Sequence, residues 1–485
     1  MTSARDFAVD ILAQLPFTPN DQQLQVALAL ARFCFPEPGQ PSADRVFILN
    51  GYAGTGKTSL TGALVRALAA RRVDSVLMAP TGRAAKVFGA YARRPASTIH
   101  RRIYRHQLPG AGGGPAPREN TCHRTVFIVD EASMIGAGDE NGRSLLTDLI
   151  QYVYSGDDCR LILLGDTAQL PPVGQTESPA MNAAEMRGYG LKVSRATLTE
   201  VARQAARSGI LRNATRLRRT LVRGRAADTD PATAAVVPLT VAAPDVDAVD
   251  GADLPDLLDS LYRADGIDET IVITRSNRSA ADFNRGIRAQ VLGYEEELVR
   301  GDLLIAAKNN YHWTRRVKGL DFVANGEILE LRRVLGSETK YGMRFSDVIL
   351  GLPGNAEVEF SAKIIPGCLS GDAAALSREQ SERLFRAVYE DPDLHAPGAS
   401  HQERIRAMQN SPYWNALQMK YAYAVTCHKA QGGQWRNVLV DLSYIPPEMA
   451  GPEFYRWLYT AVTRATSHLY FISPPEPLLE PLPSD

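Results

Sequence analysis

The stretch Gly51-Tyr52-Ala53-Gly54-Thr55-Gly56-Lys57-Thr58 matches the pattern G-x-x-x-x-G-K-[ST] of a phosphate-binding loop. Glycines in such a loop let successive backbone N–H groups turn towards the phosphates of a nucleotide. The Lys57 ammonium adds a positive charge, and the Thr58 hydroxyl is a ligand for Mg²⁺. Together with Ser59, the stretch therefore predicts a binding site for a nucleoside triphosphate.

The sequence on either side of the loop predicts a strand before it and a helix after it. Residues 45–50 form a short apolar run that is typical of a buried strand, and residues 59–70 have helical spacing of apolar side chains. Such a helix directs its positive end at the bound anion. Further apolar runs alternate with helical stretches between residues 46 and 219, which predicts a parallel sheet covered by helices.

Composition limits the class of protein. The chain has 485 residues, 45% apolar and 22% charged, which predicts a soluble globular protein of several domains. No apolar run reaches the roughly 18 residues of a membrane helix, and the first residues do not resemble a secretory signal, so a cytoplasmic protein without a membrane partner is expected. The five cysteines lack C-x-x-C spacing, which argues against a zinc ribbon or a disulfide framework.

The second half of the chain repeats the α/β pattern with an interruption. No Lys or Arg occurs between Arg225 and Arg263, and this shift in composition predicts a boundary near residues 226–256. Strand and helix patterns follow at 270–292 and return after residue 375. Between them, residues 298–370 contain short alternating segments that predict a small antiparallel barrel or sandwich.

Two further strands end in polar residues suited to nucleotide hydrolysis. The run Phe127-Ile128-Val129 is followed by Asp130 and Glu131. We expect Asp130 to hold Mg²⁺ through its water shell and Glu131 to polarise the attacking water. After residues 161–164, Gln169 can donate and accept hydrogen bonds at once, which suits a sensor of the γ-phosphate.

Phosphoryl transfer spreads negative charge over the transferred group, so arginines are expected around it. Arg203 in the run Glu200-Val201-Ala202-Arg203-Gln204 and Arg464 in the run Tyr459-Thr460-Ala461-Val462-Thr463-Arg464-Ala465 are the candidates. Considered alone, either could equally be a surface arginine.

Taken in order, the motifs resemble those of superfamily 1B DNA helicases, in the RecD-like and Dda-like branch. The matching motifs are the phosphate loop, Asp130-Glu131-Ala132-Ser133, residues 165–173, residues 203–204, Thr426-Cys427-His428-Lys429-Ala430-Gln431-Gly432 and residues 459–465. They extend from about Gln22 to Ile472. The resemblance implies an α/β fold with two RecA-like P-loop motor domains, a small β-hairpin pin insertion and an SH3-like β-barrel insertion.

The resemblance also implies a division of the chain. The first motor domain would comprise residues 1–100 and 125–225, with a pin-type insertion at 101–124 and a linker at 226–256. The second would comprise 257–297 and 371–473, with the SH3-like insertion at 298–370 and a disordered tail at 474–485. Whether the pin splits strands stays open, because its tip at 110–114 is rich in glycine.

Residue roles follow from the same resemblance. Gln22 would read the adenine, although the adjacent Gln23 is an alternative. Lys57, Asp130, Glu131 and Gln169 would act on the phosphates, with Thr58 and Asp130 holding Mg²⁺ and Arg203 and Arg464 as arginine fingers. Contacts to a DNA strand would come from residues of both motor domains, namely Pro80, Thr81, Arg83, Lys86, Thr98, His100, Thr274, Asn277, Thr426, His428, Lys429 and Gln431.

The function expected from this resemblance is that of a monomeric DNA helicase or translocase that uses ATP and Mg²⁺ and moves 5′→3′ on single-stranded DNA. Forked duplex DNA would be its substrate, and single-strand-binding or replication and repair proteins would be further partners. Two alternatives stay open: a nucleotide-switched remodeller of protein–nucleic-acid complexes that does not unwind, and a P-loop kinase or transferase. The sequence does not determine the pathway, the loading partner, the step size and processivity, or the preference for RNA or DNA.

Overall fold

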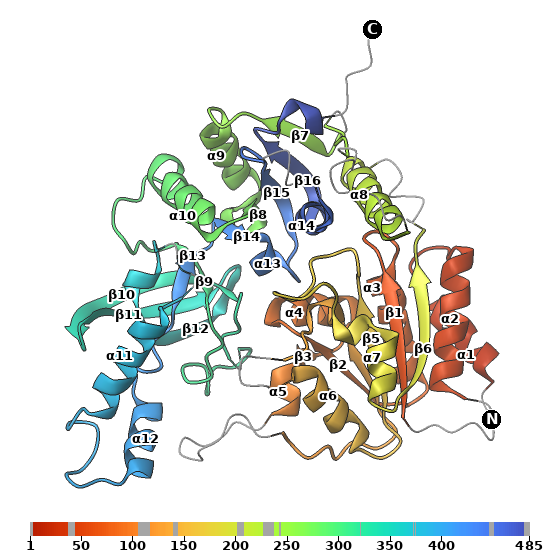
Figure 1. Ribbon diagram of the computed structural model, residues 1–485, viewed down its shortest axis with the longest axis horizontal. Coiled ribbons are helices and arrows are strands. Elements are labelled where there is room, and N and C mark those ends of the chain that lie inside the picture. Colours follow the sequence, from red (N-terminus) through yellow and green to blue (C-terminus); the bar gives the residue numbers. More distant parts are fainter. Residues whose placement is uncertain are drawn as a thin grey trace. The chain divides into compact units, whose positions relative to one another are not determined.

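The computed structural model describes residues 3–36, 44–104, 117–138, 144–200, 208–226, 237–241, 244–320, 322–371, 373, 375–445 and 451–479. The chain divides into two compact units (Figure 1). The first comprises residues 1–105, 117–244 and 446–463, and the second comprises residues 106–116, 245–445 and 464–485. Among the described residues, no helix is both long and apolar enough to cross a membrane.

The first unit is built on a parallel sheet of six strands in the order β3-β2-β4-β5-β1-β6. The strands are β1 (Arg45–Gly51), β2 (Ser75–Ala79), β3 (Ala96–Thr98), β4 (Val126–Val129), β5 (Arg160–Gly165) and β6 (Lys192–Leu198). Their β-branched and aliphatic residues suit a sheet that is covered on both faces. This sheet confirms the parallel α/β fold predicted for residues 46–219.

Helices cover both faces of this sheet. Along β1, Phe47 and Leu49 belong to one buried cluster while Val46 and Ile48 belong to another, because successive side chains of a strand point to opposite faces. The first cluster includes residues of α1 (Ala4–Ala13), α2 (Asp21–Cys34) and α3 (Lys57–Ala70). The second includes residues of α5 (Ile99–Ile103), α6 (Leu145–Tyr154) and α7 (Ala183–Gly188). The remaining helices of this unit are α4 (Gly82–Ala92), α8 (Gly209–Ala226) and α14 (Pro452–Val462).

The second unit contains another parallel sheet, in the order β14-β8-β15-β16-β7. Its strands are β7 (Val246–Val249), β8 (Thr270–Thr274), β14 (Ala424–Thr426), β15 (Trp435–Asp441) and β16 (Ala465–Ile472). Helices α9 (Leu254–Asp265), α10 (Asn277–Gly286) and α13 (Cys427–Ala430) belong to the same unit, and α10 continues as a π-helical turn at Ile287–Val291. A second parallel α/β core is thereby confirmed.

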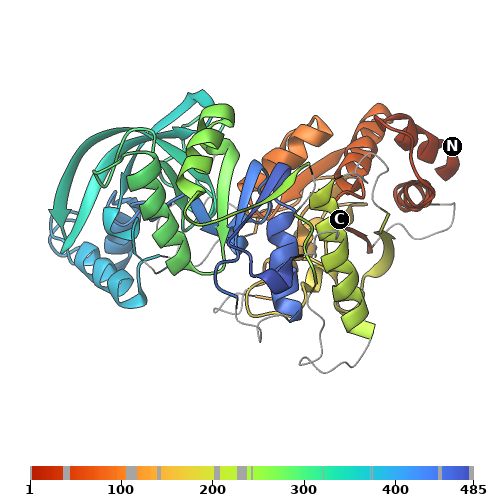
Figure 2. The same cartoon turned by 90° about the horizontal axis from the view of Figure 1, so that it is seen from above.

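An antiparallel sheet in the second unit has the order β12-β11-β10-β9-β13. Its strands are β9 (Leu303–Ala306), β10 (Ile328–Lys340), β11 (Met343–Leu352), β12 (Asn355–Ile364) and β13 (Met419–Tyr421), and the long β10–β11 hairpin forms the teal ribbons of Figure 2. Helices α11 (Arg378–Tyr389) and α12 (His401–Asn410) follow β12 in the chain. Antiparallel β structure is thus confirmed within 298–370, while the SH3-like barrel stays a prediction.

Three segments differ from the predicted division or lie beyond it. Strand β7 falls inside the predicted linker at 226–256, where Val246 is buried and pairs with Leu469 of β16. The predicted disordered tail begins with a short 3₁₀ turn at Glu476–Leu478, and Leu478 is buried. Half of the predicted pin, residues 105–116, lies outside the described residues, although Tyr104 and Pro117 form an antiparallel bridge on either side of that segment.

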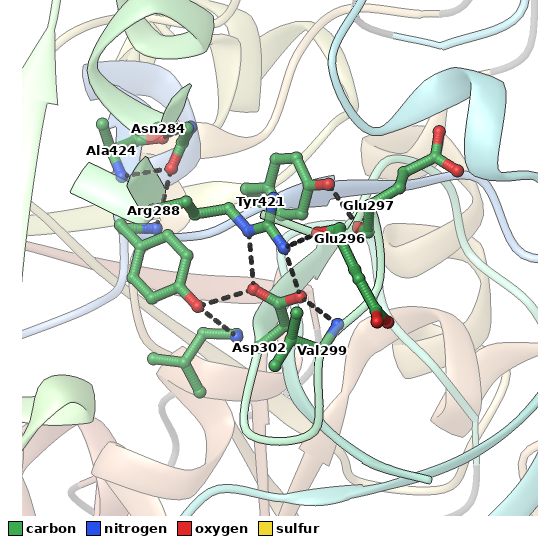
Figure 3. Close-up of polar contacts among 10 residues, drawn as sticks. Asn284, Arg288, Glu296, Glu297, Val299, Asp302, Tyr421 and Ala424 are labelled. Atoms are coloured by element: carbon green, nitrogen blue, oxygen red, sulfur yellow. Dashed lines mark hydrogen bonds and ion pairs between the residues drawn. The ribbon is translucent and has the colours of Figure 1, made fainter. Parts of the chain in front are cut away.

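A buried ion pair links the π-helical turn after α10 to the start of β9 in the second unit (Figure 3). Arg288, in the π-helical turn after α10, donates from Nε to Asp302 Oδ1 at 2.9 Å and from Nη2 to Oδ2 at 3.0 Å. Asp302 is fully buried and also accepts from the Tyr423 hydroxyl at 2.8 Å and from Val299 N at 2.8 Å. Asn284 of α10 accepts from Tyr423 N and Ala424 N, and these bonds fix α10 against the start of β14. The network therefore holds α10, β9 and β14 in one arrangement.

Substitution Asp302→Asn should lower the free energy of local opening by about 3–5 kcal/mol, because it leaves the Arg288 charge buried without its counter-ion. Hydrogen exchange of residues 284–304 and 419–424 would measure the change. Asp282→Asn is the matched control, since Asp282 pairs with Arg285 on the exposed side of α10 and such pairs contribute about 0–1 kcal/mol. Equal protection in both variants would contradict this account.

Candidate nucleotide site and nucleic-acid face

The phosphate loop connects β1 to α3 and depends on its glycines. Gly54 and Gly56 have φ values of 74° and 79°, which L side chains rarely adopt. A Cβ atom on Gly56 would lie 2.7 Å from Nε2 of Gln23, so the loop also needs glycine there for space. Helix α3 begins at Lys57, so its unpaired N-terminal N–H groups follow directly from the loop.

The two adjacent glutamines of α2 have different surroundings. Gln23 is 2% exposed, and its Nε2 donates to the Thr55 carbonyl of the loop at 3.0 Å. Gln22 is half-buried, and its Oε1 accepts from Thr199 N at 2.8 Å and from Glu200 N at 3.1 Å. Gln23 thus supports the loop, while the half-buried Gln22 amide is held by residues 199–200, its Nε2 also donating to Thr199 Oγ1 at 2.8 Å. This geometry favours Gln22 over Gln23 as the residue that meets a base.

Arg218 of α8 completes this side of the loop. Its Nη1 donates to the Thr199 carbonyl at 2.8 Å, and its guanidinium carbon lies 4.5 Å from the centre of the Tyr52 ring. Arg218 is only 9% exposed, so the stacked pair is partly desolvated and holds the Tyr52 side of the loop in place.

The acids predicted at the end of β4 lie beside Lys57. Lys57 Nζ is 4.0 Å from Asp130 Oδ1, and Asp130 is 7% exposed. Burial raises the pKa of Asp130, and the Lys57 ammonium opposes that rise. Glu131 adopts φ 52°, an uncommon value for a residue other than glycine, and its Oε2 is buried without a hydrogen-bond partner among the described residues. An unpaired carboxylate oxygen at this strand end is suited to accept a hydrogen bond from a water molecule.

Gln169 follows β5 and faces the same region. Its Oε1 and the Ser133 hydroxyl are both buried without partners among the described residues. They line one small cavity of about 10 Å³ with Asp166 and Arg456, which is about the least space that admits one water molecule. The structure therefore places Lys57 beside Asp130, and Gln169 in one cavity with Asp166, which lies in the field of Lys57 and Glu131. The roles of these residues at a nucleotide stay predictions.

The described residues contain no cluster of three or more His, Cys, Asp or Glu side chains that would hold a metal ion by protein ligands alone. One carboxylate and one hydroxyl are what Mg²⁺ commonly takes from a protein when phosphates and waters complete its shell. Asp130 at the end of β4 and Thr58 in the first turn of α3 fit that arrangement.

The two predicted arginine fingers have different outcomes. Arg203 lies outside the described residues. Arg464 belongs to the second unit, is 4% exposed and donates from Nη1 to the Gly433 carbonyl at 3.2 Å. Its role at a nucleotide stays a prediction.

The strand-contacting residues predicted for the first unit lie at one edge of its sheet. Thr81 and Thr98 follow the paired strands β2 and β3 and cap α4 and α5 by accepting from Ala84 N and Arg101 N. Thr98 is 4% exposed, so its hydroxyl is committed to the cap. Pro80, Arg83 and His100 are half-buried and Lys86 is exposed, which leaves these side chains at the surface.

In the second unit, Thr274 and Thr426 are directly paired in register across β8 and β14. Thr274 is fully buried and its hydroxyl donates to the Ser276 carbonyl, so its observed role is to shape the turn before α10. Asn277 and His428 are exposed, whereas Gln431 is 8% exposed. Burial lowers the pKa of Lys429 to about 8, and the nearby Lys420 ammonium adds to this effect.

Two segments of the chain match known protein families. Residues 40–230 match the AAA domain family, and residues 421–472 match the UvrD-like helicase C-terminal domain. The first segment contains Lys57, Asp130 and Gln169, and the second contains Thr426 and Arg464.

The chain is also 34% identical over 181 residues to the ATP-dependent RecD2 DNA helicase of Deinococcus radiodurans. These matches make the chain similar to RecD-like helicases of superfamily 1B, as its motifs led us to expect. The match covers 36% of this chain and 22% of the Deinococcus protein, so the chain spans about a fifth of that relative.

Solved structures of Pif1 helicases align along almost the whole chain. The Bacteroides Pif1 complex with ADP-AlF3 and ssDNA has a TM-score of 0.47 and 14% identity, with 96% of this chain and 95% of that chain covered. Pif1 of Candida albicans has a TM-score of 0.45 and 16% identity, with 96% of each chain covered.

Sequence reasoning missed three side chains of this RecD-like chain: Asp166, Tyr459 and Thr460. The Tyr459 hydroxyl donates to Asp166 Oδ2 at 2.6 Å and accepts from Ala53 N at 2.9 Å. Thr460 accepts from Leu170 N at 2.8 Å. All three lie inside motifs that the sequence analysis quoted, but an ordinary strand exit and an ordinary helix would show the same residue types.

The two glutamines should separate by their effects on nucleotide binding. We expect Gln22→Ala to weaken ATP more than GTP, because the half-buried Gln22 amide can exchange its contacts with residues 199–200 for contacts with a base. Gln23→Ala should weaken both nucleotides to a similar extent, by about 0.5–1.5 kcal/mol, because it removes a hydrogen bond that supports the loop. Competition binding of ATP and GTP to each variant measures the difference. If Gln23→Ala alone lost base discrimination, the assignment of Gln22 would be wrong.

Proposed function

We propose that this RecD-like chain is an ATP-dependent DNA helicase or translocase that moves 5′→3′ along single-stranded DNA. The observation that carries the proposal is the placing of Lys57 beside Asp130, with Asp166 in the field of both Lys57 and Glu131. Phosphoryl transfer needs positioning and electrostatic stabilisation more than covalent chemistry, and Lys57, Asp130 and Glu131 supply both. The RecD2 relative is described as an ATP-dependent DNA helicase, which supports the same activity here.

The chain's own residues divide the chemical work. The Lys57 ammonium would turn from Asp130 towards the phosphates, so that a cation is already in place when negative charge develops. The free Oε2 of Glu131 would accept a hydrogen bond from the attacking water and orient it. Gln169 Oε1, also unpaired, would hold the same water or sense the γ-phosphate. Bound through Thr58 and Asp130, Mg²⁺ would neutralise phosphate charge.

The proposed DNA contacts have the chemistry of backbone binding. In each unit they come from hydroxyl, amide and cationic side chains at the ends of neighbouring parallel strands, as at β2 and β3 or at β8 and β14. Such groups bind phosphates without reading bases, which suits a protein that moves along any sequence. Single-stranded and forked DNA are the proposed substrates. A monomer in the cytoplasm, with single-strand-binding or repair proteins as partners, is the setting that we propose.

Substitution Lys57→Ala should abolish DNA-stimulated ATP hydrolysis while the protein stays folded, because the loop loses its cation at the phosphates. A phosphate-release assay with and without oligothymidylate measures the effect, and circular dichroism checks the fold. Turnover like that of the wild type would refute the ATPase assignment. Hydrolysis in the wild type without stimulation by DNA would favour the nucleotide-switched remodeller.

Direction of movement is tested with forked duplexes. We expect unwinding of a fork that offers a 5′ tail and none of a substrate with only a 3′ tail. Strand separation followed by a fluorophore and quencher pair reports both cases. Unwinding from the 3′ tail alone would overturn the proposed direction and leave the ATPase assignment intact.

Lys429 predicts a pH dependence of DNA binding. Because its pKa is lowered to about 8, Lys429 is charged below that pH and loses its charge as the pH rises through it. Affinity for oligothymidylate should therefore fall between pH 7 and pH 9. Lys429→Arg should flatten the profile, because arginine stays charged. The control Lys86→Arg, on an exposed side chain of the first unit, should keep the wild-type profile. Fluorescence anisotropy measures all three, and identical profiles in all three would exclude Lys429 as a phosphate contact.

A further inference from the structure

Tyr459 makes a contact that the ATPase chemistry does not require. It lies on α14, which is grouped with the first unit, although β15 and β16 before and after it in the chain belong to the second. The side chain is 1% exposed, so its hydroxyl has no access to bulk water. Its two hydrogen bonds, from Ala53 N and to Asp166 Oδ2, therefore have no solvent competitor.

The contact to Ala53 uses a group of the phosphate loop. Backbone N–H groups of such a loop are the donors that bind phosphate oxygens. The Tyr459 oxygen therefore forms with Ala53 N–H the type of bond that an anion's oxygen would form. Because the same hydroxyl donates its proton to the Asp166 carboxylate, electron density on its oxygen increases and the bond from Ala53 is strengthened.

The chemical state of Tyr459 agrees with this arrangement. Burial and the Asp166 carboxylate raise the pKa of Tyr459 well above its usual value. The phenol thus stays protonated and keeps its donor for Asp166 at any pH where the protein works. Asp166 is 1% exposed and also accepts from Ala168 N at 2.9 Å, so it forms a fixed anchor.

Helix α14 has two more attachments beside Tyr459. Thr460 Oγ1 accepts from Leu170 N at 2.8 Å, and Arg456 Nη1 donates to the Thr167 carbonyl at 3.1 Å. Both partners lie in the segment after β5 that carries Gln169. The helix is thus held to the two segments, the phosphate loop and the exit of β5, on which the proposed γ-phosphate chemistry depends.

We propose that Tyr459 is a positioning residue that latches α14 to the phosphate loop, and that a nucleoside triphosphate competes for Ala53 N–H and releases the latch. The inference rests on the proposed function and adds to it a path by which occupancy of the loop acts on α14. Helix α14 ends at Val462, and Arg464 follows two residues later. Release of the helix therefore changes the restraint on the segment that carries the candidate arginine finger.

The test is Tyr459→Phe, which keeps the buried ring and removes only the hydroxyl. A nucleotide must break the Ala53–Tyr459 hydrogen bond before it can bind, so the bond weakens nucleotide binding. Removing it should tighten binding of the non-hydrolysable analogue AMP-PNP about 3- to 10-fold in the absence of DNA, which corresponds to the contribution of one hydrogen bond. The ratio of DNA-stimulated to basal ATP turnover should fall, because α14 no longer responds to the loop. A residue with only a structural role would weaken binding when altered, so the direction of the change is diagnostic.

Tyr455→Phe is the matched control. Tyr455 lies one turn earlier on α14, is 2% exposed, and its hydroxyl bonds to the backbone of Val237 and not to the loop. Its AMP-PNP affinity should equal that of the wild type. Unchanged or weaker binding by a folded Tyr459→Phe variant would overturn the latch.

A second variant covers the case in which Tyr459→Phe does not fold. Thr460→Val removes the bond to Leu170 N, loosens the same helix and leaves the loop untouched, so it should also tighten AMP-PNP binding. Equal or weaker binding in that variant would overturn the proposal. Failure of the proposed function looks different, because the wild type itself would then not bind AMP-PNP.

Discussion

The charge of Lys57 is the constraint on which the nucleotide side of the first unit depends. Asp130 and Asp166 are both buried, and the field of Lys57 favours the ionised form of each. Burial raises the pKa of both acids, and the cation at the start of α3 opposes that rise and so lowers the cost of keeping the two carboxylates together. The phosphates of a nucleotide would bind to the same ammonium. One cation would thus neutralise the buried acids and also bind the phosphates. The hydrogen bonds of the site would therefore change when an anion binds.

Much of this arrangement was predictable because it is local. The strand, loop and helix around residues 45–70 follow from apolar spacing and glycine positions, and the parallel sheets follow from the alternation of strands and helices. The placing of Asp130 beside Lys57 follows from a general property of parallel sheets, whose strand ends meet at one edge, and the same property brings Glu131 and Gln169 to that edge. No such rule distinguished Gln22 from Gln23, since their roles depend on which face of α2 meets the loop.

What the sequence could not reveal depends on contacts between distant segments. Tyr459 and Ala53 are 406 positions apart, and nothing in either motif indicates that they meet. Arg288 and Asp302 look like ordinary surface charges until the fold buries them. The burial of Thr274 likewise depends on packing. The sequence does not indicate whether a threonine hydroxyl at a strand end faces solvent or bonds to the following turn.

The Arg288–Asp302 pair has a mechanical consequence for the second unit. Asn277 begins α10, and Thr426 ends β14, so both residues belong to elements that the pair and Asn284 hold together. A bidentate ion pair fixes the orientation of the groups that it joins more closely than apolar contacts do. Any displacement of α10 would therefore carry the start of β9 and β14 with it, so that these segments move as one body.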